Sequence, residues 1–311
     1  MQRQPLNLWA WRDRAQEFHL GISEGPSPVA VDLAAWDPAL TSVEAIWRRH
    51  QREGHGDWAW LGQALSDEPR VQVELSRVTM EFTLTLDELW AAGVTYEQSR
   101  EARTRESQGG EDFYRKVYDA KRPELFFKAP GSRVVGPDAV MGLRPDSGWT
   151  VPEPELTVIL DPSGEIFGYT AGNDLSARDI EGENPLYLPQ AKMFHHGAAL
   201  GPSIALRDSL IPTQLDIQLT VFRGGMVVLD DRTHTSRMRR SLPELVQYLT
   251  TAWPLARWTG LMTGTGIVPP DDFSLQPGDE ICVAITGIGT LRNAVRTIHP
   301  AWVDLPRPRS S

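Results

Sequence analysis

The sequence has little of three things that would assign it to a particular class of protein: cysteine, long apolar runs and basic charge. Cys282 is the one cysteine among 311 residues, so no disulfide can form within the chain, which suits a reducing compartment. No apolar run approaches the ~20 residues that a membrane-spanning helix needs, and the N-terminus does not lead into an apolar signal segment. We therefore expect a cytoplasmic protein without membrane attachment.

The shortage of basic charge limits the possible partners. The formal net charge is -10 and the pI is near 5.2, which leaves no surplus of Lys and Arg to neutralise phosphates. The short basic cluster at Arg237, Arg239 and Arg240 precedes Ser241-Leu-Pro-Glu244, a capping-box pattern, and is typical of a solvated loop before a helix. We expect no nucleic acid partner.

The composition and its change along the chain predict two domains. Hydrophobic residues make up 41% and charged residues 23%, as in an ordinary globular protein with a sizeable core. A polar break at residues 67–70 separates a tryptophan-rich beginning from the alternating run at residues 71–75. We predict a small N-terminal domain over residues 1–72 and a catalytic domain over residues 73–311.

The hydrophobic spacing predicts an α+β fold that is mainly β. Helical spacing is clearest in residues 42–50, 86–90, 97–117 and 242–251. Strand-like runs separated by Gly, Pro and Asp turns occupy residues 155–160, 166–170, 215–222, 226–229 and 280–286. The glycines of Gly287-Ile-Gly289 lie between two strand-like runs, which predicts a hairpin turn and argues against a phosphate-binding loop.

The segment that carries chemistry begins with two glutamates. Glu153 and Glu155 stand at i and i+2 of a predicted strand, so both side chains point to one face. If residues 161–164 form a four-residue turn and Leu160 pairs with Glu165, Asp174 on the returning strand lies on the same face. A solvated acidic face is the alternative interpretation.

Three neighbouring carboxylates repel one another, and a hard divalent cation with oxygen ligands relieves the repulsion. We therefore predict a Mg²⁺ site, with Mn²⁺ or Ca²⁺ as substitutes. Gly168 and Gly172 are expected to leave space beside the metal for a ligand. Lys192 is expected to enter the site from an adjacent strand and to supply positive charge, with Gln190 on the same strand face and in contact with the substrate.

Several motifs in one order resemble the fumarylacetoacetate hydrolase family over roughly residues 85 to 300. They are Glu153-x-Glu155, Gly172-Asn-Asp174-Leu-Ser176-Ala-Arg178-Asp179, Lys192, Leu200-Gly-Pro202, Thr263-Gly-Thr265-Gly266 and Thr286-Gly-Ile-Gly-Thr-Leu-Arg-Asn293. The resemblance implies a mixed β-roll with a small N-terminal domain, a Mg²⁺ held by Glu153, Glu155 and Asp174, and a lysine, Lys192, near the substrate carbonyl. It also implies that Thr265 meets the substrate carboxylate, and that the protein is a homo-oligomer, a dimer or tetramer.

One departure from the family pattern bears on the reaction. Hydrolases and decarboxylases of the family carry Tyr-x-x-His-x-x-Glu, whereas this chain has Tyr96, Ser99 and Ala102 at those positions. Without the His-Glu dyad, water attack loses a general base that contributes on the order of 10²–10⁴-fold in rate. The segments at residues 122–128 and 181–192 resemble instead the sugar-acid dehydratase branch of the family, whose members convert 2-dehydro-3-deoxy-pentonates to 2,5-dioxopentanoate.

The expected function is therefore that of a Mg²⁺-dependent lyase of pentose degradation, which dehydrates a 2-dehydro-3-deoxy-pentonate. The branch resemblance implies that Glu124 acts as the acid for the leaving hydroxyl, and Lys192 supports the negative charge. Two alternatives stay open at this point. One is an acylpyruvate C–C hydrolase or oxaloacetate decarboxylase of the same family, and the other is a non-catalytic protein that binds 2-oxo acids through the same metal site.

Overall fold

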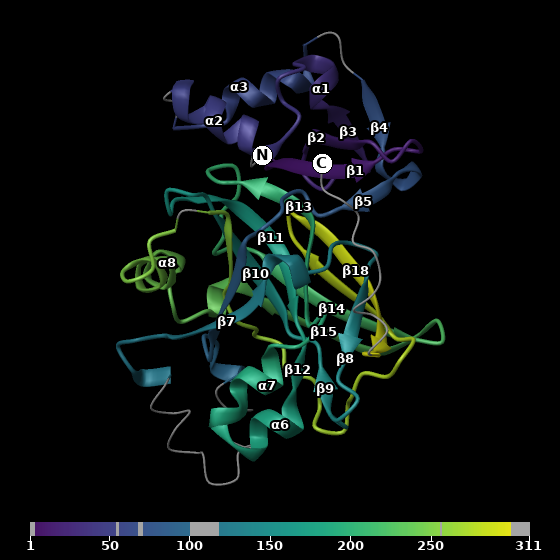
Figure 1. Ribbon diagram of the computed structural model, residues 1–311, viewed down its shortest axis with the longest axis vertical. Coiled ribbons are helices and arrows are strands. Elements are labelled where there is room, and N and C mark those ends of the chain that lie inside the picture. The colour runs from purple at the N-terminus through teal and green to yellow at the C-terminus, as the bar shows by residue number, and fades with distance from the viewer. Residues whose placement is uncertain (1–3, 54–55, 68–70, 100–117, 256, 300–311) are drawn as a thin grey trace.

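The computed structural model describes residues 4–53, 56–67, 71–99, 118–255 and 257–299. Two sheets form the body of the protein (Figure 1). The larger has 11 strands in the order β4-β3-β2-β1-β13-β11-β10-β16-β6-β7, and β5 also pairs with β1. The smaller has five strands in the order β15-β14-β17-β18-β8, and β9 pairs with β12 in a separate ribbon.

The strands of the larger sheet are β1 (Leu6–Arg12), β2 (Phe18–Glu24), β3 (Val29–Asp32), β4 (Gln72–Glu74), β5 (Thr79–Glu81), β6 (Glu88–Gly93), β7 (Glu124–Pro130), β10 (Pro154–Leu160), β11 (Ile166–Asp174), β13 (Ala198–Leu206) and β16 (Thr259–Met262). The others are β8 (Val140–Leu143), β9 (Thr150–Val151), β12 (Ser176–Ala177), β14 (Asp216–Arg223), β15 (Met226–His234), β17 (Glu280–Ile285) and β18 (Gly289–Thr297). The helices are α1 (Leu33–Trp36), α2 (Val43–Glu53), α3 (Ala59–Gly62), α6 (Arg178–Glu183), α7 (Leu188–Lys192) and α8 (Leu242–Thr250).

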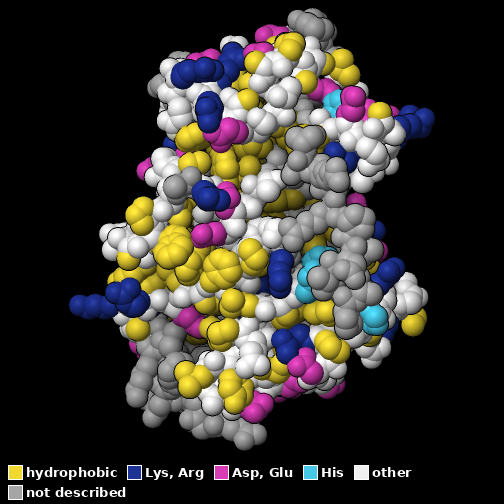
Figure 2. Space-filling model, viewed as in Figure 1, with side chains coloured by type: hydrophobic (Ala, Val, Ile, Leu, Met, Phe, Trp, Pro, Cys, Tyr) yellow, Lys and Arg dark blue, Asp and Glu magenta, His cyan; other side chains and the backbone are white. Residues whose placement is uncertain are grey.

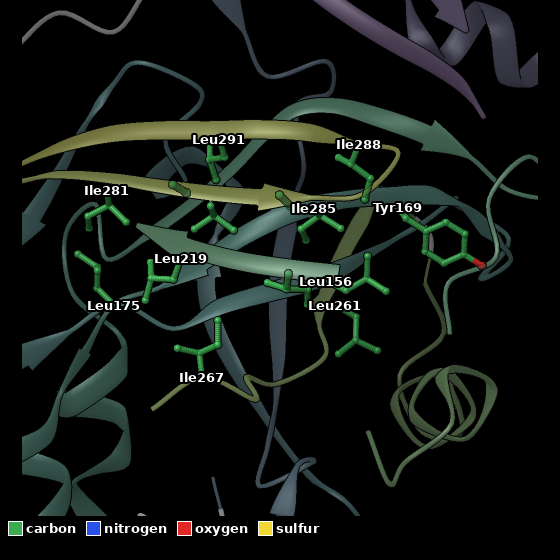
Figure 3. Packing of buried hydrophobic residues seen from close by; sticks show 14 of the residues in the cluster. Leu156, Tyr169, Leu175, Leu219, Leu261, Ile267, Ile281, Ile285, Ile288 and Leu291 are labelled. Atoms are coloured by element: carbon green, nitrogen blue, oxygen red, sulfur yellow. The ribbon is translucent and has the colours of Figure 1, made fainter. Parts of the chain in front are cut away.

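The main core lies between the two sheets. Alternate residues of β10, β14 and β17 meet there, among them Leu156, Leu219 and Ile281 (Figure 3). These three side chains are at most 1% exposed. Every residue of β10 is buried, because a second cluster covers the other face of that strand. The strand that bears Glu155 is therefore held on both sides, which limits how far it can move.

The second cluster joins the N-terminal region to the rest of the chain. Leu8 of β1 and Ile46 of α2 belong to it together with Ile159 of β10. In addition, β1 pairs with β13, with Asn7 opposite Ala205. Helices α1, α2 and α3 lie with β1 to β4 at one end of the molecule (Figure 1, top). The predicted boundary at residues 72/73 falls inside the pairing of β4 with β3 and stays a prediction.

The predicted fold class, α+β and mainly β, is confirmed, and so are most predicted elements. The five strand-like runs became β10, β11, β14, β15 and β17. The helices predicted at residues 42–50 and 242–251 became α2 and α8, and residues 287–289 join β17 to β18 as a hairpin turn. The helix predicted at residues 97–117 lies outside the described residues beyond position 99.

The helix predicted at residues 86–90 is wrong. The segment begins β6, which pairs in parallel with β16 and antiparallel with β7. Leu89 and Ala91 are fully buried, whereas Trp90 between them is half-buried, which is the alternation of a strand. Five residues are too few to separate the two periods, so the neighbouring strands decided the structure.

On the face shown in Figure 2, acidic and basic side chains are interspersed with hydrophobic ones. Among the residues that the structure describes, no helix is long and apolar enough to cross a membrane.

Candidate metal centre and active site

The hairpin of β10 and β11 brings the carboxylates together in a register that differs from the predicted one. Glu155 lies opposite Gly172, and the N–H of Asp174 donates to the carbonyl of Glu153 over 2.9 Å. The prediction placed Glu155 opposite Thr170, two residues away. Because side chains alternate with a period of two, an offset of two residues leaves every side chain on the expected face.

Two local features of the hairpin cause the offset, and each shifts the register by one residue. Asp161 pairs with Glu165 at the turn, since its N–H donates to the Glu165 carbonyl at 2.9 Å, so the loop is one residue shorter than predicted. The register then shifts between Ile159 and Leu160, where Phe167 is the extra residue of a β-bulge. The Asp161 carboxylate stabilises the turn by accepting hydrogen bonds from the N–H groups of Ser163 (2.8 Å) and Glu165 (3.1 Å).

Glu153, Glu155 and Asp174 form a compact buried cluster. One carboxylate oxygen from each lies within 4.8 Å of the others, and the residues are 4%, 1% and 1% exposed. The alternative of a solvated acidic face is therefore wrong.

Three cationic side chains contact the cluster. Lys192 Nζ lies 2.8 Å from Glu153 Oε2 and 3.2 Å from Asp174 Oδ2, and Arg178 Nη1 lies 3.3 Å from Glu153 Oε1. Lys128 Nζ contacts the other oxygen of Asp174 and donates to the carbonyls of Leu175 (3.0 Å) and Lys192. The charge of the three carboxylates is thus matched by two ammonium groups and one guanidinium.

The buried charges shift each other's ionisation. Burial, followed by the charges of Asp174 and Glu153, raises the pKa of Glu155 well above its ordinary value. Lys192 and a hydrogen bond from the N–H of Gly264, at 2.6 Å, act in the opposite direction. Burial lowers the pKa of Lys128, and the charge of Asp174 opposes that effect. A cation at the cluster would remove the repulsion that raises the Glu155 pKa.

Lys192 reaches the cluster from a helix, so the strand predicted for residues 190–192 is wrong. It is the last residue of α7, a short helix that begins at Leu188 and has Pro189 in its first turn. Residues two apart in a helix point in very different directions, whereas in a strand they share a face. Gln190 is consequently exposed on α7, and among the described residues it does not line the pocket beside the cluster.

That pocket opens beside the carboxylates and collects the other predicted site residues. Glu124, the first residue of β7, and Thr265, which is 6% exposed, both line it. Glu124 fits because Gly93 lies opposite it on β6: a Cβ on Gly93 would stand 2.2 Å from Glu124 Oε2. Arg178 and Glu181, three residues apart on α6, line a further wall.

The space expected beside Gly168 and Gly172 is taken by packing. A Cβ on Gly168 would lie 2.5 Å from the carbonyl oxygen of Ala205 on β13, and one on Gly172 would lie 2.4 Å from Thr157 Oγ1. These glycines let β13 and the buried side chains approach the sheet. The expectation that they open a ligand space is wrong, and among the described residues Gly93 and Gly264 are the glycines that line the pocket.

Lys128 is a further residue of the site that the sequence does not assign, because its local pattern suits a surface lysine as well as a site residue. In the run Leu125-Phe-Phe-Lys128-Ala-Pro130 it is the one charged side chain inside an apolar strand. Its side chain is 1% exposed, and a fully buried lysine is rare unless it is paired. The contact with Asp174 joins positions 46 residues apart, which no local pattern reports.

The donor set fits a divalent metal ion. Three convergent carboxylates offer the hard oxygen ligands that Mg²⁺, Mn²⁺ and Ca²⁺ prefer. A bound cation would also offset the repulsion between Glu155 and the two neighbouring carboxylates. Glu153, Glu155 and Asp174 would hold the ion, and the pocket lies directly beside these three carboxylates.

Comparisons with known proteins agree on one family. The sequence model of the fumarylacetoacetate (FAA) hydrolase C-terminal domain matches residues 89–296. A probable 2-keto-3-deoxyxylonate dehydratase of Haloferax volcanii is 50% identical over 213 residues, 68% of this chain and 73% of that protein. A 2-dehydro-3-deoxy-D-arabinonate dehydratase of Saccharolobus solfataricus is 46% identical over 213 residues, 67% of this chain and 72% of that protein.

A solved structure resembles nearly the whole chain. It is a 2-keto-3-deoxy-D-arabinonate dehydratase complexed with magnesium and 2,5-dioxopentanoate, with a TM-score of 0.76 and 33% identity, and the match covers 94% of this chain and 99% of that one. Since the family model spans well over half of the sequence, the chain belongs to the fumarylacetoacetate hydrolase family.

Proposed function

We propose that the protein is a Mg²⁺-dependent dehydratase that converts a 2-dehydro-3-deoxy-pentonate to 2,5-dioxopentanoate in pentose oxidation. The buried cluster of Glu153, Glu155 and Asp174, flanked by two lysines, is the observation that carries this proposal. The two dehydratases at 50% and 46% identity support the reaction, and the related structure with magnesium and 2,5-dioxopentanoate supports the metal and the product class.

The metal ion, when bound by the three carboxylates, supplies Lewis acidity for the carboxylate and 2-oxo oxygen of the substrate. Lys192 lies beside two of the carboxylates, so its ammonium group is available to stabilise the negative charge that develops on the 2-oxo oxygen when a C3 proton leaves. Thr265, which lines the same pocket, is proposed to orient the substrate carboxylate.

Glu124 is proposed to be the acid of the elimination. Its protonated carboxyl transfers a proton to the C4 hydroxyl, the C4–O bond breaks, and water leaves as a C3–C4 double bond forms. Loss of a proton from C5 and return of a proton at C3 then move the double bond to C4–C5 and give an enol. Loss of the enol hydroxyl proton and protonation at C4 give the aldehyde of 2,5-dioxopentanoate, so the net change is the loss of one water. Gln190, predicted as a substrate contact, is left out because it is exposed on α7.

Hydrolysis is the weaker candidate because a serine stands at the position of the catalytic histidine of the hydrolases. Ser99 stands where the hydrolases carry histidine, and it lines the pocket with its hydroxyl donating to the Tyr96 carbonyl at 2.7 Å. A serine hydroxyl does not accept a proton from water at neutral pH. Position 102, the second member of the dyad, lies outside the described residues.

The decisive experiment follows the reaction by NMR. Purified protein with Mg²⁺ is mixed with both C4 epimers of 2-dehydro-3-deoxy-pentonate, and 2,5-dioxopentanoate is expected from at least one. Product from neither epimer would sink the dehydratase proposal. Turnover of an acylpyruvate would favour the hydrolase, and Mg²⁺-dependent pyruvate binding without turnover of any sugar acid would favour a binding protein.

The proposal extends to the setting of the enzyme. Its ligand would be a small 2-oxo sugar acid, and we propose a cytoplasmic location and a homo-oligomer, a dimer or tetramer. Size-exclusion chromatography with light scattering measures the oligomeric state directly.

A further inference from the structure

We propose that Thr95 is a positioning residue of the metal centre: its hydroxyl holds the turn at residues 263–265 so that the N–H of Gly264 points at the carboxylate of Glu155. This inference rests on the proposed metal site. It concerns a residue that is neither one of the three carboxylates nor one of the residues that line the pocket.

Thr95 is tied to the turn by a short buried contact. Its side chain is 1% exposed, and Oγ1 donates to the carbonyl oxygen of Thr263 at 2.6 Å. From the other side, the N–H and the hydroxyl of Thr263 both donate to the Leu156 carbonyl on β10, at 3.1 and 2.8 Å. The residue before Gly264 is therefore clamped between the strand that bears Glu155 and the end of β6.

Only glycine fits at position 264 of this turn. Its φ is +90°, in the region that side chains rarely adopt, and a Cβ there would lie 2.0 Å from Thr95 Oγ1. The Thr95 hydroxyl thus occupies the space that a side chain would need. Because the residues around Gly264 are held in place, its N–H donates a hydrogen bond to Glu155 Oε2 over 2.6 Å in the protein interior.

The direction of that N–H matters because it determines how the Glu155 carboxylate is turned. The carboxylate is fully buried beside two other carboxylates, so its orientation decides whether an oxygen faces the site of the ion. A hydrogen bond to one oxygen fixes the rotation of the carboxylate and leaves the other oxygen for the ion. Groups that orient a ligand in this way typically change metal affinity by about 10–100-fold when they are removed.

The same turn bears Thr265, which lines the pocket. Thr265 Oγ1 accepts from the N–H of Ile267 at 3.1 Å, so the turn is also closed on its far side. A substitution of Thr95 would therefore affect the orientation of Glu155 more strongly than the position of Thr265, the proposed substrate contact. We expect the affinity for Mg²⁺ to change more than the catalytic rate at saturating Mg²⁺.

The test compares Thr95→Val with a matched control. Thr83 is 2% exposed and its hydroxyl also donates to a backbone carbonyl, that of Leu8 at 3.3 Å, far along the chain from the carboxylates. Both variants lose one buried hydroxyl, so a general packing effect should alter them alike. Thr95→Ser keeps the donor, and Thr95→Ala removes it without the methyl group that valine places toward Gly264.

Isothermal titration with Mg²⁺ alone is performed on the full-length proteins, with thermal unfolding measured in parallel. Thr95→Val and Thr95→Ala are each expected to weaken Mg²⁺ binding about tenfold or more, whereas Thr83→Val and Thr95→Ser stay within about threefold of the parent protein. Unchanged Mg²⁺ affinity in either donor-free variant, or an equal loss in Thr83→Val, overturns the role of Thr95.

The outcome is separable from the proposed function. A parent protein that binds no Mg²⁺ contradicts the metal centre itself, and with it this inference. A parent protein that binds Mg²⁺ but forms no 2,5-dioxopentanoate contradicts the dehydratase proposal alone, because the titration needs no substrate.

Discussion

The backbone N–H of Asp174 donates to the carbonyl oxygen of Glu153, with 2.9 Å between nitrogen and oxygen. This bond lies at the end of the pairing of β10 with β11, and it joins two of the three carboxylate residues through their main chains. The spacing of the two residues is therefore independent of the charges that their side chains bear. Side-chain substitutions therefore test the metal centre while this backbone hydrogen bond stays in place.

Replacing Glu153 by Gln should abolish Mg²⁺-dependent dehydration, by about 100-fold or more, because it removes one anionic ligand with little change in volume. Initial rates by NMR with and without Mg²⁺ measure the effect, and circular dichroism checks that the variant is folded. Glu165→Gln is the control, since that side chain is 71% exposed at the turn of the same hairpin. Full activity in the Glu153 variant would refute the ligand assignment.

Replacing Lys128 by Met should lower the free energy of unfolding by about 3–5 kcal/mol. The change leaves the Asp174 carboxylate buried without its nearest cation and two carbonyls, of Leu175 and Lys192, without a donor. Urea unfolding without metal measures the loss. The matched variant Lys121→Met, at an exposed position, should change stability by less than about 0.5 kcal/mol. Equal effects at the two positions would show that Lys128 is not needed by the cluster.

Replacing Gly93 by Ala should reduce kcat by about tenfold or more and leave stability nearly unchanged. The new methyl group would stand 2.2 Å from Glu124 Oε2, and the end of a flexible side chain moves away more easily than a strand does. Steady-state kinetics at saturating Mg²⁺ detect the loss. Gly148→Ala serves as the control, because a Cβ there would meet only Asp179 Oδ2, at 4.0 Å. If kcat were unchanged, Glu124 would not be the proposed acid.

His196 should make the protein less stable as the pH falls. Burial, followed by the charges of His195 and Arg133, lowers the pKa of His196 to about 4. In the unfolded chain a histidine takes up a proton near pH 6.5, so between roughly pH 6.5 and 4 the unfolded state binds a proton that the folded state does not. The contribution is present above pH 6.5 and is lost on acidification, by about 1–2 kcal/mol after allowance for partial exposure.

The variant His196→Asn isolates this effect, because asparagine accepts the positive φ of 54° at that position. Unfolding in urea at pH 8 and pH 5 should show a smaller fall in stability for the variant than for the parent protein. An identical fall in both would assign the acid sensitivity to other groups.

The sequence alone predicted five of the strands, and it predicted the face to which the carboxylates point. Alternating apolar residues predicted β10 and β11, and the i, i+2 spacing put Glu153 and Glu155 on one face. The turn and the bulge at Phe167 each shifted the register by one residue. Because the two shifts add to an even number, the Asp174 side chain still points to the predicted face of the sheet. Motif order also led to the family that the comparisons show.

Tertiary structure decided what surrounds the carboxylates, because those contacts join residues distant in sequence. Lys128 meets Asp174, Gly264 meets Glu155, and Thr95 meets Thr263 across 168 positions. The helix α7, which turns Gln190 outward, and the strand pairing that made residues 88–93 a strand were likewise set by neighbours rather than by local period. Local sequence specifies to which face of a helix or strand each side chain points. Only tertiary packing brings groups that are distant in sequence within hydrogen-bonding distance of each other.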